Sequence, residues 1–460
     1  MSVLRAYFLP HPPLAVPQVG RGDEKKIQKT LDAFDRTAKE IAALKPETIV
    51  FITPHSILYA DYFHISPGKG AKGSFARFGA PGVGFDVGYD REMADKIIEI
   101  AESKELPAGY MGERDPALDH GVTVPLWFIN RYFNDFNIVR ISQSGESPSS
   151  HYLLGQAIQT AAEKIGRRTV LIASGDLSHK LPGSHYGYAP EGVEYDKRIT
   201  EVMASADFLS AFNIPESLRE RAGECGHNSL MVLAGIFDSA EVTSELYSYE
   251  GPFGVGYGIA CFSPGKADES RNFLEQYEKQ SLQQALEIKK GEDAYQSLAR
   301  QSLEYTVKTS RRLELPEDLP KELLNKRAGV FVSLHKNGAL RGCIGTISPA
   351  AENIGREIIR NAVSAGLEDG RFLPVTEDEL PFLTYKVDVL MPTEPISGPE
   401  ELDVKKYGVI VTSGYKRGLL LPNLDGIDTV DEQIAIAKRK AGIRDGETVS
   451  LERFEVIRHE

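Results

Sequence analysis

The chain has 460 residues, of which 41% are hydrophobic and 26% are charged, so it is long enough for two or three domains with sizeable cores. Its 66 acidic and 53 basic residues give a net charge of −13, which argues against nucleic acid or an anionic membrane as the main partner. Three scattered cysteines without a CxxC pair do not indicate a disulfide framework. The N-terminus "MSVLRAYFLPHPP" reaches proline too soon for a signal peptide, and no apolar run is long enough for a membrane span, which favours a cytoplasmic protein.

The first half of the chain alternates short apolar runs with amphipathic segments. That order predicts an α/β domain with a mostly parallel sheet and helices on both faces. A hairpin-like segment, residues 244–262, closes the domain near Pro264. The expected strands lie at residues 4–9, 48–53, 136–142 and 168–174, and the expected helices lie at 23–44, 93–101 and 153–165.

A change of composition separates a second domain from the first. Residues 266–291 are polar and charged and predict a linker helix between a domain at 1–265 and another at 292–460. The second domain combines strand patterns with helices, which predicts a separate α+β fold. Its expected strands are 328–335, 384–391, 407–414 and 448–458, and its expected helices lie around 298–307 and 350–365.

Histidines follow three of the predicted strands in the first domain. His11 comes after "AYFLP", His55 after "VFITP" and His179 after "VLIASGDLS". A single histidine after a strand is more often a loop residue than a ligand. However, loops after the carboxyl ends of parallel strands share one edge of the sheet, where ligands bind. We therefore expect these imidazoles to converge.

A metal site needs a further ligand, and "AGECGHNSL" offers Glu224 just before a predicted helix. His11, His55 and Glu224 form a two-histidine, one-carboxylate set that suits Fe(II) holding both a substrate and O₂. Cys225 and His227 are rival ligands beside Glu224, and the spacing leaves the choice open. Glu224 is also explained as a carboxylate that answers the helix dipole.

Other catalytic patterns are missing from the sequence. It contains no HExxH and no GxSxG motif, and we interpret the glycine-rich runs "GVGFDVG" and "GVGYG" as turns. The loop that carries Lys69, Lys72 and Arg77 hints at an anionic substrate, but a solvated basic loop explains it more simply.

Together, "PHPP", "TPHS", "LDHGVTVPL", "SGDLSH" and "ECGHNSL" resemble the LigB-type extradiol ring-cleavage dioxygenases, across about residues 1–264. The resemblance implies Fe(II), with zinc or manganese as alternatives, a small aromatic diol and O₂ as substrates, and a role in aromatic compound metabolism. His179 would act as the base, and His120 in "LDHG" resembles the second active-site histidine. A histidine packed under a helix start beside Asp119 explains His120 equally well. Asp176 would orient His179.

The second half resembles the AMMECR domain through "LRGCIGT", "DGRFLPV" and "RGLLLPNLDG", across about residues 292–460. This fusion is similar to the AmmeMemoRadiSam group, which implies a radical-SAM protein as partner. Cys343 beside Arg341 is either a reactive thiol or, more simply, a packing cysteine. The sequence does not decide whether the protein forms a homo-oligomer.

The sequence therefore predicts an enzyme, an extradiol dioxygenase fused to an AMMECR domain. One alternative is a Memo-like metal-binding or redox-regulatory protein without ring cleavage, because Memo-type proteins share the fold and depart at the metal site. The other alternative is a zinc-dependent hydrolase that uses the same pocket.

Overall fold

The structure is a computed structural model that describes residues 2–112, 117–424 and 426–460. The chain divides into two compact units, Met1–Tyr277 and Glu278–Glu460, and helix α10 (Phe273–Lys290) runs through the division. Among the described residues, no helix has the length and apolar character needed to cross a bilayer.

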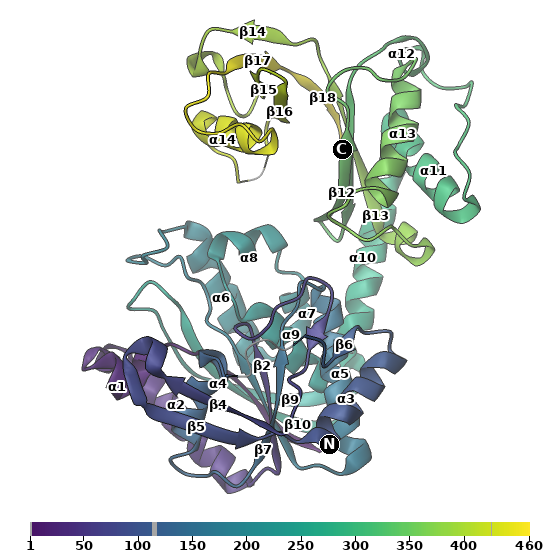
Figure 1. The fold of residues 1–460 in the computed structure, drawn as a ribbon. Coiled ribbons are helices and arrows are strands. Elements are labelled where there is room, and N and C mark those ends of the chain that lie inside the picture. Colours follow the sequence, from purple (N-terminus) through teal and green to yellow (C-terminus); the bar gives the residue numbers. More distant parts are fainter. Residues whose placement is uncertain (1, 113–116, 425) are drawn as a thin grey trace. The chain divides into compact units, whose positions relative to one another are not determined.

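A six-stranded sheet forms the centre of the first unit (Figure 1), and its strand order is β7-β2-β8-β1-β10-β9. The four strands from β7 to β1 are parallel, and β10 and β9 join them as an antiparallel pair. This mixed, mostly parallel sheet confirms the predicted fold class. Its strands are β1 (Val3–Leu9), β2 (Thr48–Thr53), β7 (Asn137–Ser142), β8 (Thr169–Ser174), β9 (Ala240–Glu250) and β10 (Tyr257–Ala267).

Both faces of this sheet are buried, because successive side chains of a strand point to opposite sides. Every residue of β2 is buried, with Val50 and Ile52 in one core and Ile49 and Phe51 in the other. Helices α3, α5, α6 and α9 contribute to the first core, and α2 and α4 contribute to the second. The helices of this unit are α1 (Pro17–Gly20), α2 (Gln28–Leu44), α3 (Arg91–Ser103), α4 (His120–Ile129), α5 (Pro148–Ile165), α6 (Pro190–Ser205), α7 (Phe208–Phe212), α8 (Glu216–Ala222) and α9 (His227–Ile236).

Two small sheets lie beside the large one. Strands β3 (Phe63–His64) and β6 (Ala108–Gly109) pair in parallel, and β4 (Gly70–Phe75) and β5 (Ala80–Gly88) form an antiparallel hairpin. Interpreting "GVGFDVG" as a turn was therefore wrong. This run is most of β5, and the structure pairs it with β4 although four of the nine residues of β5 are glycine or proline.

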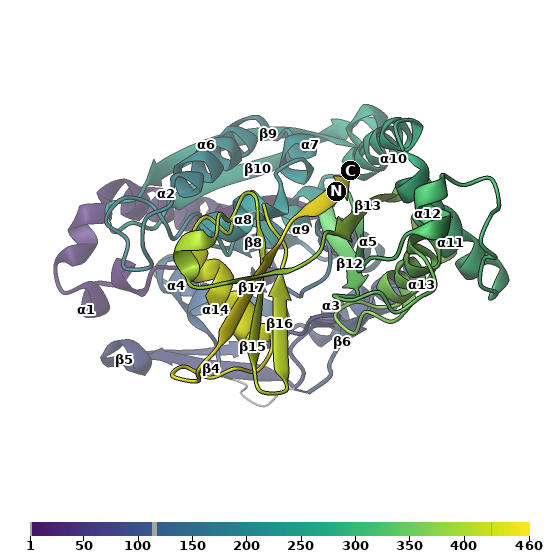
Figure 2. The same cartoon turned by 90° about the horizontal axis from the view of Figure 1, so that it is seen from above.

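The second unit contains two four-stranded sheets, ordered β12-β11-β13-β18 and β14-β17-β15-β16, and all of their pairings are antiparallel. Figure 2 shows α14 beside strands β15 and β16. The predicted strand at 448–458 divides into β17 and β18, which belong to different sheets. The elements are β11 (Val330–Lys336), β12 (Ala339–Gly345), β13 (Leu383–Leu390), β14 (Glu394–Ile396), β15 (Gly408–Ser413), β16 (Lys416–Leu420), β17 (Ser450–Phe454), β18 (Val456–His459), α11 (Ala294–Thr309), α12 (Lys321–Asn325), α13 (Ile354–Leu367) and α14 (Val430–Lys440).

Candidate metal centre

The candidate site lies at the carboxyl ends of the parallel strands. His11 follows the last residue of β1 by two positions, and His55 follows the last residue of β2 by two positions. In each case the intervening residue is a proline, whose missing N–H ends the strand ladder at this point. The ends of β1 and β2, which lie on either side of β8, thus present both imidazoles at one edge of the sheet.

Three donor atoms come together there. Nε2 of His11 lies 2.9 Å from Nε2 of His55 and 3.7 Å from Sγ of Cys225, and the ligand atoms of these three residues lie within 4.8 Å of one another. A tetrahedral ion with ordinary Zn–N and Zn–S bond lengths separates its donor atoms by roughly 3.3–3.6 Å. The three side chains therefore fit a single metal ion after small shifts.

The carboxylate of Glu224 does not join this group. Its Oε2 accepts a hydrogen bond of 2.7 Å from the backbone N–H of His227, which begins α9. The ring of His227 also turns away, with Nδ1 3.4 Å from the hydroxyl of Tyr195. Glu224 therefore accepts a hydrogen bond from one of the backbone N–H groups that have no partner within the first turn of the helix. The geometry therefore gathers Cys225, and neither Glu224 nor His227, with the two histidines.

Two further histidines surround the three donors. The ring of His120 stacks on that of His55 with a centroid distance of 4.0 Å, and it contacts the ring of His11 edge to face with a centroid distance of 5.1 Å. His179 is close enough to affect the pKa values of both His11 and His55. All four imidazoles that the sequence singled out thus gather at one edge of the sheet.

Asp176 has a different partner from the one predicted. Its Oδ1 accepts a hydrogen bond of 2.9 Å from the backbone N–H of His11, and its Oδ2 lies 3.9 Å from Nε2 of the same residue. Burial raises the pKa of Asp176 to about 7. Asp176 therefore supports His11 and is a further oxygen donor beside the three residues named above.

Burial keeps the histidines neutral. Burial, followed by the neighbouring His55, His120 and His179, holds the pKa of His11 well below its ordinary value. Desolvation lowers the pKa values of both His55 and His120 to about 4. Neutral imidazoles have a free nitrogen lone pair, which is the form that binds metals.

The thiol of Cys225 behaves in the opposite way. Burial, and then the charge of Asp176, raises the pKa of Cys225 well above its ordinary value. In the metal-free protein this side chain is therefore a protonated thiol, and a bound cation would displace the proton.

Aromatic side chains stand next to the histidines. Phe78 ends the 3₁₀ turn η3 (Ala76–Phe78) between β4 and β5. Its ring contacts that of His120 edge to face, with a centroid distance of 5.5 Å. Tyr186, which is 65% exposed, meets the ring of His179 at 5.6 Å. Neither residue is among the site residues predicted from the sequence. Tyr186 follows His179 in the same loop, which was a usable signal, whereas Phe78 in "SFARFG" is far from His120 in the sequence and only the fold brings them together.

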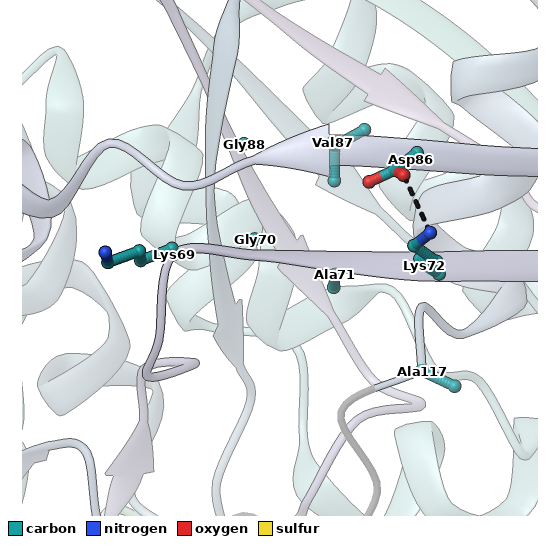
Figure 3. Close-up of a pocket in the computed structure, with 8 residues that line it drawn as sticks. All are labelled: Lys69, Gly70, Ala71, Lys72, Asp86, Val87, Gly88 and Ala117. Atoms are coloured by element: carbon teal, nitrogen blue, oxygen red, sulfur yellow. Dashed lines mark ion pairs between the residues drawn. The ribbon is translucent and has the colours of Figure 1, made fainter.

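A separate pocket of about 670 Å³ lies at the β4–β5 hairpin and includes Ala117 in its lining (Figure 3). Lys72 forms an ion pair of 3.0 Å with Asp86 across the two strands, as Figure 3 shows. The lining of this pocket includes none of the site histidines. Within the hairpin, Asp86 balances the charge of Lys72.

In the second unit, Cys343 sits in the edge strand β12. Its Sγ lies 3.2 Å from the hydroxyl of Ser333, its N–H donates to Asp369 at 2.9 Å, and Arg371 donates to its carbonyl at 3.2 Å. Burial raises the pKa of Cys343, although Ser333, Arg371 and Lys440 oppose that effect. These contacts fasten the loop after α13 to β12. The "LRGC" and "DGRF" motifs therefore have a structural role at this position.

Comparison with known proteins identifies a family for each part of the chain. Residues 5–260 match the family described as the catalytic LigB subunit of aromatic ring-opening dioxygenase, and residues 296–459 match the AMMECR1 family. The chain belongs to the LigB family and carries an AMMECR1 domain after its LigB domain. Both resemblances expected from the motifs are confirmed.

Two relatives match this chain over its whole length or over part of it. Protein CA_C1420 of Clostridium acetobutylicum is 43% identical over 470 residues and covers 100% of this chain and 99% of its own length. A protein of Thermotoga maritima is 48% identical over 171 residues, which are 37% of this chain and 98% of its own. Among solved structures, the uncharacterized protein JW3007 of Escherichia coli is 14% identical with a TM-score of 0.39, covering 56% of this chain and 99% of its own.

Proposed function

We propose that the LigB domain is a metal-dependent oxidoreductase that opens the ring of a small aromatic diol with O₂. The observation that supports this proposal is the convergence of His11, His55 and Cys225 on a space that fits one ion, with both imidazoles held neutral by burial. Membership of the LigB family supports the reaction class. Iron is the proposed metal, because it binds both imidazole and thiolate and exchanges electrons with O₂.

A bound iron ion would lower the pKa of the diol hydroxyls and supply redox chemistry towards O₂. The protein supplies the proton transfers. Desolvation lowers the pKa of His179, so this imidazole is neutral at pH 7 and able to accept a phenolic proton at its free nitrogen. His120 stacks on His55 and, because its pKa is about 4, it too can serve as a proton acceptor at neutral pH.

Phe78 and Tyr186 are the proposed contacts of the aromatic ring. Each stands beside one of the two proton-handling histidines and is partly exposed, at 37% for Phe78 and 65% for Tyr186. Aromatic pairs are stabilised by offset or edge-to-face contact with ring centroids 4.5–7 Å apart. A planar substrate between these side chains would exclude water from the groups that exchange protons.

The test begins with metal analysis of protein purified with and without air, followed by oxygen uptake across a panel of aromatic diols. We expect iron to give a coloured ring-opened product. The His179→Ala variant should retain iron and substrate binding but lose turnover, whereas His185→Ala, which changes an imidazole in the same loop next to Tyr186, should keep it. Wild-type turnover in His179→Ala would show that the base lies elsewhere.

Cys225 favours a second candidate function, a metal-binding redox-regulatory protein without ring cleavage. Soft thiolate ligands select Cu(I) and zinc as well as iron, and a thiol at the site makes it sensitive to oxidation. In that case the purified protein would hold copper or zinc, and no diol would increase its oxygen consumption after iron loading.

A further inference from the structure

Three segments of the first unit meet at the hydroxyl of Ser174, the last residue of β8. Its Oγ lies 2.7 Å from the carbonyl oxygen of Gly121 in α4 and 2.9 Å from Nδ1 of His11 after β1. Ser174 is fully buried, and His11 is 1% exposed. The protein must therefore satisfy the hydrogen bonds of both side chains internally.

The carbonyl of Gly121 needs a donor from outside its helix. In an α-helix this carbonyl would accept from the N–H four residues later, but that residue is Pro125, which has no N–H. The hydroxyl of Ser174 takes the place of the missing donor. Pro125 thus explains why a helix carbonyl is available to a serine from another strand.

This donation determines the proton position on His11. A serine hydroxyl has one hydrogen, and a carbonyl oxygen can only accept, so the hydrogen of Ser174 points to Gly121. The same Oγ can then only accept from Nδ1 of His11. We propose that Ser174, through Pro125 and Gly121, fixes His11 as the tautomer with hydrogen on Nδ1 and leaves Nε2 free as the metal-binding atom.

The nitrogen left free is the one that faces the other donors. Nε2 of His11 lies 2.9 Å from Nε2 of His55 and 3.7 Å from Sγ of Cys225. The partner of the second ring nitrogen commonly sets the tautomer of a metal-binding histidine. Ser174 is therefore a positioning residue, and this role rests on the proposed metal site.

Gly121 is required for the close approach of these groups. A Cβ at this position would lie 2.4 Å from Oγ1 of Thr53, 2.9 Å from Oδ1 of Asp119 and 3.3 Å from Oγ of Ser174. Oγ1 of Thr53 accepts from the backbone N–H of His55 at 3.2 Å and donates to Asp119 at 2.7 Å. Gly121 thus lies where the supports of His11 and His55 meet.

The first experiment reads the tautomer directly in metal-free protein. Full-length chain labelled with ¹⁵N-histidine is treated with a chelator, and long-range ¹H–¹⁵N correlation spectra are recorded, with His11 assigned by its loss in His11→Ala. We expect an unprotonated Nε2 and a protonated Nδ1. A protonated Nε2 on His11 would overturn the proposal, and this outcome does not depend on whether the protein cleaves a diol.

The second experiment measures Co(II) affinity from the visible absorption of the bound ion. Ser174→Ala should bind Co(II) about 10- to 100-fold more weakly than wild type. The matched control is Ser302→Ala, which removes another fully buried serine hydroxyl that donates to a helix carbonyl, that of Ile359, in the second unit. That variant should keep wild-type affinity. Unchanged affinity in Ser174→Ala would contradict a positioning role.

A third variant tests the proline. Pro125→Ala returns a backbone N–H to the carbonyl of Gly121, so the hydroxyl of Ser174 is free to rotate towards His11. We expect a mixture of the two His11 tautomers and an affinity for Co(II) below that of wild type. A single wild-type tautomer with wild-type affinity would refute the part assigned to Pro125.

Discussion

Glu379 provides the sharpest quantitative prediction. This carboxylate accepts two hydrogen bonds from Arg341, at 2.7 and 3.0 Å, and one from Lys336 at 2.9 Å, and its side chain is 14% exposed. Burial opposes ionisation, but Arg341 and Lys336 outweigh it and lower the pKa of Glu379 to about 2. Arg341 belongs to the "LRGC" motif, so this ion pair tests what that motif does.

The expected magnitude follows from the pKa. A change from 4.5 in the unfolded chain to about 2 corresponds to about 3 kcal/mol of stability, and partial solvent screening reduces this to about 2 kcal/mol. Because the folded pKa is the lower one, the contribution is complete above pH 4.5 and is lost as the pH falls towards 2. Glu379→Gln should therefore destabilise the second unit at pH 7, and its difference from wild type should shrink below pH 4.5.

The assay uses Cys343, because the other two cysteines, Cys225 and Cys261, lie in the first unit. Protein equilibrated in urea is pulse-labelled with a pyridyl disulfide, which reacts with thiols in mildly acidic solution, and labelling of Cys343 is quantified by mass spectrometry. The control is Glu377→Gln, an exposed carboxylate in the same 3₁₀ helix, η5 (Glu377–Phe382). The reasoning would be refuted if Glu379→Gln lost the same free energy of unfolding at pH 7 and at pH 3.5, or if its loss at pH 7 were under about 0.5 kcal/mol.

Three further predictions concern the first unit. His11→Ala and His55→Ala should retain the far-ultraviolet circular dichroism of wild type but lose the bound metal, and full metal occupancy in either would contradict the assigned site. Phe78→Leu should raise KM for an aromatic diol several-fold with little change in kcat, and an unchanged KM would argue against ring contact. Burial raises the pKa of Asp196 to about 7, so the stability of wild type relative to Asp196→Asn should fall as the pH rises from 4 to 7. Urea titrations of both proteins, followed by the fluorescence of Trp127, should show this change in their difference, and parallel profiles would show that Asp196 does not titrate.

The sequence predicted the large sheet well because its strands are short and buried on both faces. The run "TIVFIT" is the whole of β2, and the strand expected at 168–174 differs from β8 by one residue. Local composition was sufficient where hydrophobic strands alternate with amphipathic helices. Local composition did not predict β5, because glycine and proline are uncommon in strands and this strand is defined by its pairing with β4.

The site was predictable in outline but not in its donors. Strand ends located His11 and His55, because the edge of a parallel sheet is a consequence of topology. Sequence spacing cannot tell which of the adjacent residues Glu224 and Cys225 is the metal ligand. In the structure, Glu224 accepts a hydrogen bond from the first N–H of α9, which leaves Cys225 beside the histidines. The sequence did not indicate a role for Ser174, Gly121 or Pro125, because these residues are related only through hydrogen bonds between distant segments.

Strand β1 begins at the third residue of the chain, yet it lies between β8 and β10 in the sheet. Its partners reach from Thr169 to Phe262, so its pairings close loops of more than a hundred and sixty residues. During synthesis, β1 emerges well before the segments with which it pairs, so its hydrogen bonds are completed only after those segments have been made. Because His11 directly follows this strand, we expect a nascent chain to acquire its metal only after the LigB domain has almost entirely left the ribosome.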